Sequence, residues 1–403
     1  MNKTETRSRT DGIFNFLGFR FFTIGIVVAV SLVLGVGFGI YFAKRHWPLI
    51  SQFGEKFRML EQKYFWRPPE VELPNLMSTN EIKELIAAKT PVQVESGRKA
   101  LRNSFHGAQC LTDSNQTGID RIAPLEDKTI STKLGEYLYI RLPYGFESRA
   151  RYFRSERQSG ILLIYHTGHS GQTLDDTLAI STILKAGIDV VAIDMPMSGQ
   201  NNQPVIAIPN VGRVRFSQHD QLRTLETDNF NPLVLFVEPI ACLINHFSNA
   251  GKYQKMVQVG FSGGGNIASL YAALDTRILK TFSVAGQYPV FLRQSNPTRD
   301  WGDYEQVNAL LSKHVSDLDL YVMAAHGGRG RTYVQVFNQF DPCCYAGRRS
   351  DLYSQIVAER VRELGLGKFE VWFDDLNYSH SISSATVANI LSSLNISDVD
   401  PVQ

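Results

Sequence analysis

Residues 256–274 decide the fold of this chain, and they read MVQVGFSGGGNIASLYAAL. An apolar run, a G-x-S-x-G turn centred on Ser262 and a helix of small residues follow one another directly. A strand that enters a helix through so tight a turn forces the central residue into a strained backbone conformation, and the flanking glycines leave room for it. The sequence therefore predicts an exposed, nucleophilic serine at position 262. A merely structural turn is the alternative.

Apolar runs alternate with helical patterns from about residue 129 onward. Residues 161–165 are apolar throughout, which is typical of a strand that is buried on both faces of a parallel sheet. Strands that alternate with helices imply right-handed crossovers and a doubly wound, mostly parallel α/β sheet. Strands are expected at residues 136–142, 161–165, 189–193, 256–259, 280–285, 333–337 and 369–373, and helices at residues 174–186, 232–247, 265–274, 352–364 and 384–394.

Two longer inserts interrupt this alternation, at residues 198–229 and 288–327. Both leave the carboxyl end of a predicted strand, which is where an open α/β sheet binds its ligand. We therefore expect them to form a lid and the walls of a substrate pocket. Tyr288, Trp301 and Tyr304 are candidates for lining that pocket, with burial in the core of the insert as the alternative.

A serine hydroxyl needs a base within hydrogen-bond reach, and an acid orients that base. For a serine in a G-x-S-x-G turn, the expected chain order is serine, then Asp or Glu, then His. Asp341 follows the predicted strand at 333–337, and His380 follows the last predicted strand at 369–373. The sequence therefore predicts a catalytic series of Ser262, Asp341 and His380 at one edge of the sheet.

Other residues compete for the two partner positions. Asp374 and Asp375 are alternative acids, although both lie on the same strand end as His380. Asp341 precedes a proline, so it is also an ordinary turn residue. Only His380 follows the last strand, whereas the remaining histidines lie in loops, inserts, helices or outside the main domain: His46, His106, His166, His169, His219, His246, His314 and His326.

A tetrahedral oxyanion needs a pair of backbone N–H groups. One is expected from Gly263, the residue after the serine, at a helix N-terminus that adds positive potential. The other is expected from the glycine-rich loop at residues 166–171, where Thr167, Gly168 or His169 is in the right place. An ordinary strand-to-helix turn is the alternative explanation of that loop.

The chain resembles the α/β-hydrolase superfamily over residues 130–398. The loop at 166–171, the sequence GFSGG at 260–264, Asp341 and His380 carry this resemblance. It implies an α/β-hydrolase fold in which Ser262 is the nucleophile, Asp341 the acid and His380 the base, with no metal and no organic cofactor. The acid turn, Asn-Gln-Phe-Asp-Pro-Cys-Cys, departs from the small-residue pattern that is common in the family. The chain looks most like the esterase, acetyl-esterase and dienelactone-hydrolase-like members.

The resemblance implies a serine hydrolase of carboxylic esters that acts through an acyl-enzyme intermediate. Its substrate is expected to be a small-molecule, glycan or lipid ester. An acyltransferase that uses the same three residues is one alternative, and a non-catalytic binding protein on the same scaffold is another. Fold alone cannot separate these functions.

The N-terminal region predicts a single-pass membrane anchor. Residues 21–43 contain no charged side chain and are long enough to cross a bilayer core of about 30 Å. A cleavable signal peptide is the alternative, but its apolar region would be shorter. Residues 1–20 form the preceding tail, and basic residues on both sides leave the orientation open. We interpret residues 44–128 as a helical spacer that packs on a catalytic domain at 129–403, with a capping box at Ser78–Glu81.

Composition excludes several other functions. The 41 Lys and Arg residues nearly balance the 39 Asp and Glu residues, so nothing indicates nucleic-acid binding. No phosphate loop, zinc-protease motif or dinucleotide fingerprint is present, and the histidines are too scattered to suggest a metal site.

The adjacent Cys343 and Cys344 are expected to be two reduced thiols, because a disulfide between neighbours is rare. Cys110 and Cys242 are expected to pair only in an oxidising compartment.

Overall fold

The computed structural model describes residues 77–125, 130, 135–294, 299–307 and 313–394. The chain divides into two compact units, Met1–Arg67 and Pro68–Gln403, and every described residue belongs to the second. The predicted tail at 1–20, the predicted anchor at 21–43 and residues 44–76 of the predicted spacer therefore lie outside the described residues. None of the helices in the described part of the chain has both the length and the hydropathy to span a bilayer.

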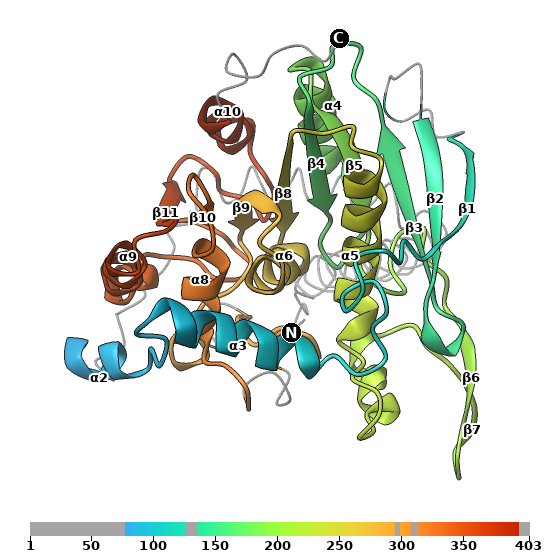
Figure 1. Ribbon diagram of the computed structural model, residues 1–403, viewed down its shortest axis with the longest axis horizontal. Coiled ribbons are helices and arrows are strands. Elements are labelled where there is room, and N and C mark those ends of the chain that lie inside the picture. Colours follow the sequence, from blue (N-terminus) through green and yellow to red (C-terminus); the bar gives the residue numbers. More distant parts are fainter. Residues whose placement is uncertain (1–76, 126–129, 131–134, 295–298, 308–312, 395–403) are drawn as a thin grey trace, which may run out of the picture. The chain divides into compact units, whose positions relative to one another are not determined.

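A nine-stranded sheet organises the described unit, with the order β1-β2-β3-β5-β4-β8-β9-β10-β11 (Figure 1). Its strands are β1 (Ile119–Pro124), β2 (Gly135–Arg141), β3 (Glu147–Phe153), β4 (Ile161–His166), β5 (Asp189–Ile193), β8 (Lys255–Phe261), β9 (Ile278–Val284), β10 (Thr332–Asn338) and β11 (Lys368–Asp374). The six strands from β5 to β11 in this order pair in parallel. The predicted doubly wound, mostly parallel sheet is confirmed, and it fits an α/β-hydrolase-like fold.

The antiparallel edge of the sheet differs from the sequence-based prediction. β1, β2 and β3 pair in antiparallel fashion, and β3 also runs antiparallel to β5. Only β2 among these three was expected. β1 reads IDRIAP and β3 reads ESRARYF, so neither shows the apolar run or the clean alternation that identifies a strand. Sheet pairing therefore overrides a weak local pattern here.

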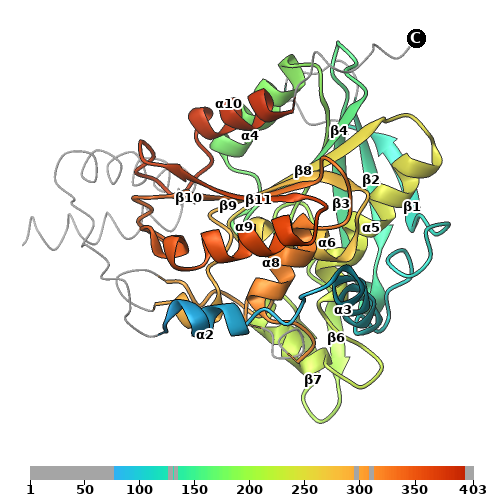
Figure 2. The same cartoon turned by 60° about the vertical axis from the view of Figure 1, so that its left-hand side comes forward.

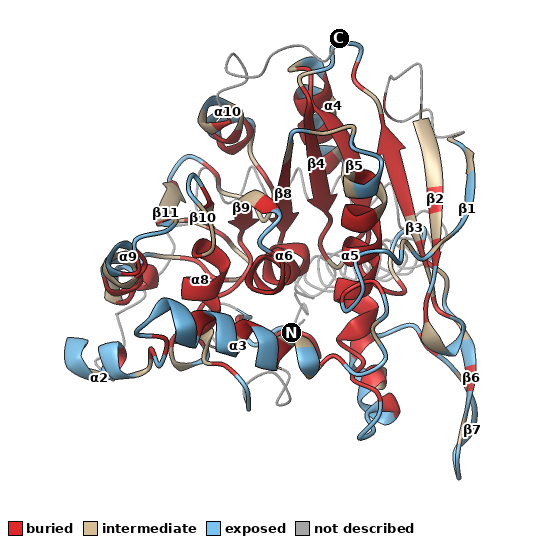
Figure 3. Cartoon of the chain, in the orientation of Figure 1, coloured by how far each residue is buried: buried red, intermediate tan, exposed pale blue. Residues whose placement is uncertain are grey.

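Helices cover both faces of the sheet (Figure 2). One face packs against α4 and α10, and the other packs against α5, α6, α8 and α9, with α3 lying on α6 and α8, so that the described unit has two separate apolar cores. Burial colours in Figure 3 show the central strands and α6 buried, whereas α2 and much of α3 are exposed. The helices are α2 (Thr79–Glu84), α3 (Pro91–Asn103), α4 (Leu174–Lys185), α5 (Val234–Asn249), α6 (Gly263–Leu274), α8 (Asp317–Ala325), α9 (Ser354–Glu363) and α10 (Ser384–Ser393).

Residues 77–124 are tightly attached to the rest of this unit. The predicted capping box is confirmed, because the side chains of Ser78 and Glu81 each accept a backbone N–H from the other residue. Arg98 of α3 donates to the carbonyl oxygens of Ala273, at the end of α6, and Met323 of α8. The buried Glu238 of α5 accepts three backbone N–H groups of residues 109–111.

A disulfide joins Cys110 to Cys242 of α5, which lie 132 positions apart in the sequence. The sequence left this pairing open, and the structure forms it. In the same region β1 belongs to the main sheet, so the covalent bond, the sheet and the buried contacts all tie residues 77–124 to the residues that follow. The division at residue 128 remains a sequence-based prediction.

The two inserts add structure at the carboxyl ends of the strands. The first contains a hairpin of β6 (Val205–Ile208) and β7 (Gly212–Arg215), followed by a 3-10 helix at His219–Leu225. The hairpin is mostly exposed (Figure 3). The second insert contains α8, whose N-cap Ser316 accepts the N–H of Asp319. Of the three aromatic residues singled out in this insert, Tyr288 and Tyr304 are fully buried, whereas Trp301 is partly exposed.

Candidate active site

The turn between β8 and α6 holds Ser262 in an unusual backbone conformation. Its φ is 54° and its ψ is −124°, a region that non-glycine residues rarely occupy. The neighbouring glycines are required by close packing. A Cβ at Gly264 would collide with the carbonyl oxygens of His166 and Thr167, and one at Gly260 would collide with the carbonyl of Gly264. The G-x-S-x-G sequence thus matches the space that the tight turn leaves.

The structure brings together the three residues that chain order predicted. His380 Nε2 lies 2.9 Å from Ser262 Oγ, and His380 Nδ1 lies 2.8 Å from Asp341 Oδ2. Asp341 follows β10 and His380 lies between β11 and α10, so both come from carboxyl ends of parallel strands. The Asp341 side chain is fully buried, whereas that of His380 is 22% exposed. The imidazole therefore connects a buried carboxyl group to the serine hydroxyl.

The alternative acid Asp374 has a different position in the structure. Its Oδ2 accepts hydrogen bonds from the hydroxyls of Ser383 and Thr386, at the start of α10, and its Oδ1 accepts the N–H of Leu376. These contacts tie β11 to the following helix. No hydrogen bond among the described residues joins Asp374 or Asp375 to His380.

The loop after β4 lies directly against the serine. A Cβ at Gly168 would lie 3.0 Å from the Cβ of Ser262, and one at Gly263 would collide with the ring of His169. The N–H of Thr167 donates to the carbonyl of Ile193 at 3.0 Å, so this group is already used. Gly263 begins α6, where a backbone N–H has no partner within the helix. The N–H groups of Gly263 and of Gly168 or His169 remain the predicted oxyanion donors.

His166 is unsuited to proton transfer at this site. Burial lowers its pKa to about 4, and its Nδ1 faces the carbonyl oxygen of Thr167 at 2.9 Å. Its place beneath the turn is structural, because a Cβ at Gly264 would also contact its ring.

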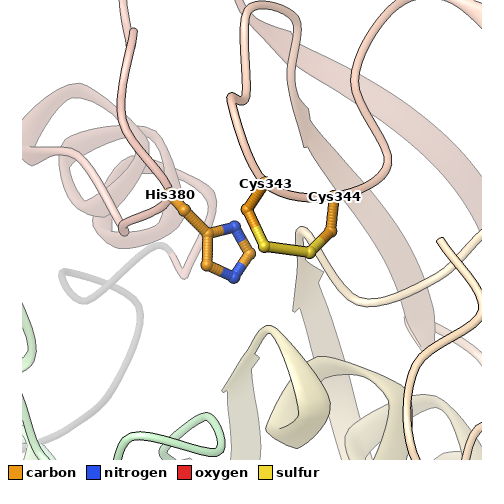
Figure 4. Close-up of side chains that lie close together, drawn as sticks. All are labelled: Cys343, Cys344 and His380. Carbon is orange, nitrogen blue, oxygen red and sulfur yellow. A yellow bond between two sulfur atoms is a disulfide. The ribbon is translucent and has the colours of Figure 1, made fainter. Parts of the chain in front are cut away.

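The acid turn corrects one prediction. Cys343 and Cys344 form a disulfide and are not two reduced thiols, and Figure 4 shows their sulfur atoms beside the ring of His380. Reduced thiols were expected because a disulfide between neighbouring residues is rare. Here the backbone N–H groups of Cys343 and Cys344 both donate to Asp341 Oδ1, at 2.8 and 3.2 Å, so the segment is a tight turn. The cysteine pair thus holds the second oxygen of the acid.

One cluster near the site was missed by sequence reasoning. His169 Nε2 lies 2.7 Å from Glu305 Oε1, and His219 Nδ1 lies 3.0 Å from Glu305 Oε2. Burial alone would raise the pKa of Glu305, but the two imidazoles outweigh it and lower this pKa to about 2. The pKa of His219 is raised, because the Glu305 carboxylate outweighs the opposing effect of burial. No motif could have indicated this cluster, since its members come from the loop after β4 and from both inserts.

A cavity of about 510 Å³ lies beside this cluster. Glu305 and Asn266 of α6 contribute polar groups to its wall, and Trp301, Phe291 and Leu318 contribute apolar surface. The second insert therefore does form the wall of a pocket, which Trp301 lines. Ser262 is not among the residues that line it.

Comparisons with known proteins identify the fold. No protein-family profile and no curated protein matches the chain. Among solved structures, acetyl xylan esterase 1 from a Thermoanaerobacterium species superposes with a TM-score of 0.50 and 16% identity, over 79% of this chain and 99% of that one. The methylesterase BT1017 superposes with a TM-score of 0.52 and 14% identity, over 81% of this chain and 70% of that one. At such low identity, what the chain shares with these two proteins is their fold.

Proposed function

We propose that this protein is a serine hydrolase that cleaves carboxylic esters through an acyl-enzyme intermediate. The observation that carries the proposal is the hydrogen-bonded series Ser262, His380 and Asp341, at 2.9 and 2.8 Å, on a strained strand-to-helix turn. The two solved structures that share the fold are named as esterases, which agrees with this chemistry.

In the proposed mechanism, the Oγ of Ser262 attacks the acyl carbonyl while His380 Nε2 takes the hydroxyl proton. Asp341 holds the proton on Nδ1 and stabilises the imidazolium that forms. His380 then gives its proton to the leaving alcohol, and the acyl group stays on Ser262. Water, activated by the same imidazole, hydrolyses the acyl-enzyme and restores the serine.

The developing oxyanion is proposed to bind two backbone N–H groups. Gly263 supplies one at the N-terminus of α6, where the helix dipole adds positive potential. Gly168 or His169 supplies the other, because the loop lies against Ser262 and the N–H of Thr167 is already bonded. Such a donor is worth about 10²–10³ in kcat when it is removed from a comparable site.

The proposed substrate is a small-molecule, glycan or lipid ester. We propose that the inserts at 198–229 and 288–327 cover the acyl or alcohol part of that substrate, because they follow the carboxyl ends of the strands. We propose that the cavity lined by Trp301 and Glu305 holds this part of the substrate.

A fluorophosphonate probe, which reacts with activated serines, tests the chemistry. Wild-type protein is expected to label and to hydrolyse p-nitrophenyl acetate. Both properties are expected to disappear in Ser262→Ala and in His380→Ala, with a loss of about 10⁶ in kcat. Ser114→Ala is a matched control, because this serine is exposed and lies in a distant loop.

The outcomes of this test separate the alternatives. Failure of the folded wild-type protein to label would overturn the proposal and favour a binding protein on the same scaffold. Labelling without hydrolysis, together with transfer to an added sugar or lipid alcohol, would assign the same residues to acyl transfer.

We also propose that residues 21–43 anchor the protein in a membrane as a single-pass helix. The absence of charge over this length supports the proposal. The full chain is expected to stay with membranes after washing at high pH, and a chain that lacks residues 1–43 is expected to be released. Release of the full chain by the same wash would contradict the anchor.

A further inference from the structure

Four ionisable side chains meet beside the loop after β4, although they come from three distant parts of the chain. His169 lies in that loop, His219 begins the 3-10 helix of the first insert, and Asp303 and Glu305 belong to the second insert. One nitrogen or oxygen atom from each residue lies within 4.8 Å of the corresponding atoms of the other three. This set of residues is called the insert cluster below.

The distances within the insert cluster suit coordination of a small cation. His169 Nε2 lies 2.7 Å from Glu305 Oε1 and 3.4 Å from Asp303 Oδ2. His219 Nδ1 lies 3.0 Å from Glu305 Oε2 and 3.8 Å from Asp303 Oδ2. Neighbouring ligands around a tetrahedral zinc ion are about 3.4 Å apart, given metal–ligand bonds of about 2.1 Å. The observed separations scatter around that value.

Hydrogen bonding leaves two acceptor atoms facing each other in this cluster. His219 Nε2 lies 2.9 Å from the carbonyl oxygen of Pro196, so this nitrogen carries an N–H, and in the neutral imidazole the lone pair is on Nδ1. His219 Nδ1 then presents a lone pair to Glu305 Oε2. Neither of these two atoms has a hydrogen-bond partner in the described part of the chain, and both residues are at least 95% buried. Such an arrangement requires a positive charge, which is either a proton on His219 or a bound cation.

We propose that His169, His219, Asp303 and Glu305 bind a divalent transition-metal cation of the zinc class. Two imidazoles and two carboxylates favour zinc over magnesium or calcium, which prefer oxygen ligands alone. The bond from His219 to Pro196 fixes the ring and its tautomer, as partners of metal-binding histidines generally do. The side chain of Asp303 is 51% exposed and gives the ion a path from solvent.

The proposed ion has a structural consequence that does not depend on the proposed function. It joins both inserts to the loop that lies against Ser262, so that three otherwise separate segments share one centre. Because the ion binds the folded state, the free energy of unfolding is expected to rise with the logarithm of the ion concentration once that concentration exceeds Kd.

Calorimetric titration of zinc chloride into chelator-treated, full-length protein tests the proposal. The experiment is run at pH 7.5, above the ordinary imidazole pKa of about 6.5, and without reductant, so that both disulfides stay formed. We expect one ion per chain and a thermal midpoint that rises with zinc concentration. Glu305→Gln is expected to abolish binding, and the half-exposed Asp303→Asn to weaken it at least about tenfold while still folding.

Two control variants make the result specific. His106→Asn removes an exposed histidine outside the cluster, and His380→Ala removes the imidazole that lies beside Cys343 and Cys344. Both are expected to bind zinc as the wild-type protein does. Loss of binding in His380→Ala with retention in Asp303→Asn would overturn the proposal. The absence of any bound zinc in folded wild-type protein would also overturn it, and would leave a proton between His219 and Glu305.

Discussion

Two buried carboxylates each meet a histidine near Ser262, and the two pairs differ in what surrounds them. Asp341 Oδ2 lies 2.8 Å from His380, and its Oδ1 accepts two backbone N–H groups from the acid turn. Glu305 lies 2.7 Å from His169, but its second oxygen faces His219. The first carboxylate is therefore held by backbone and serves one imidazole, whereas the second lies between two imidazoles.

The difference shows that a buried carboxylate–imidazole pair does not by itself define a proton relay. What distinguishes His380 is its other nitrogen, which lies 2.9 Å from the hydroxyl of Ser262. The ring of His169 instead lies against Gly263, and His219 is bound to a backbone carbonyl. In the proposed mechanism the first pair moves a proton, whereas the second pair joins segments that are distant in the sequence.

Replacing each of the two carboxylates by its amide is expected to give the largest difference in kcat between the two pairs. Asp341→Asn is expected to lower kcat about 10⁴-fold, because the amide favours the wrong tautomer of His380. Glu305→Gln keeps the size of its side chain and does not touch Ser262, so kcat is expected to stay within about tenfold of wild type. Steady-state hydrolysis of p-nitrophenyl acetate measures both values. Equal losses in the two variants would show that Glu305 belongs to the reaction itself.

The pH dependence of the free energy of unfolding reports how Glu305 and His219 ionise. The pKa of this carboxyl lies near 2, below its ordinary 4.5, so its contribution is present above pH 4.5 and is lost as pH falls toward 2. The pKa of His219 is raised above 6.5, so its contribution is present below pH 6.5 and is lost as pH rises through the raised value. The difference in free energy of unfolding between wild type and Glu305→Gln is therefore expected to be largest between pH 4.5 and 6.5, on the order of 3 kcal/mol.

Urea denaturation in the presence of a chelator, followed by circular dichroism from pH 3.5 to 8, measures this difference. Asp341→Asn serves as the matched control for removal of a buried carboxylate. A difference between wild type and Glu305→Gln that does not change with pH would contradict the predicted ionisation of the cluster.

Removal of the disulfide between Cys343 and Cys344 is expected to have a smaller effect on kcat, and it tests how Asp341 is held. Cys343→Ser removes the disulfide while leaving the backbone N–H donors in place, and it is expected to lower kcat about tenfold through small shifts of Asp341 and His380. The double variant Cys110→Ser/Cys242→Ser removes the distant disulfide and is expected to lower stability without changing kcat. An unchanged kcat in Cys343→Ser would show that the turn keeps its shape without the covalent bond.

Local pattern and chain order predicted much of the fold and the residues that meet at Ser262. The apolar runs of β4, β5 and β10 mark buried strands, and Asp341 and His380 follow strand ends in the expected order. β1 and β3 were missed because neither contains an apolar run, and pairing with neighbouring strands makes them part of the sheet. The insert cluster was missed because His169 and Glu305 are 136 residues apart and only the folded inserts bring them together.

Three arginines at the far end of α6 bear on which part of the chain can fold alone. Arg98 and Arg102 of α3, together with Arg331, donate to the last carbonyl oxygens of the helix that begins at Ser262. A chain shortened to residues 129–403 would lose two of these arginines and strand β1, and would leave Cys242 without its partner. The portion of the protein that must fold is therefore larger than the portion that carries the proposed chemistry, and recombinant versions should begin no later than residue 77.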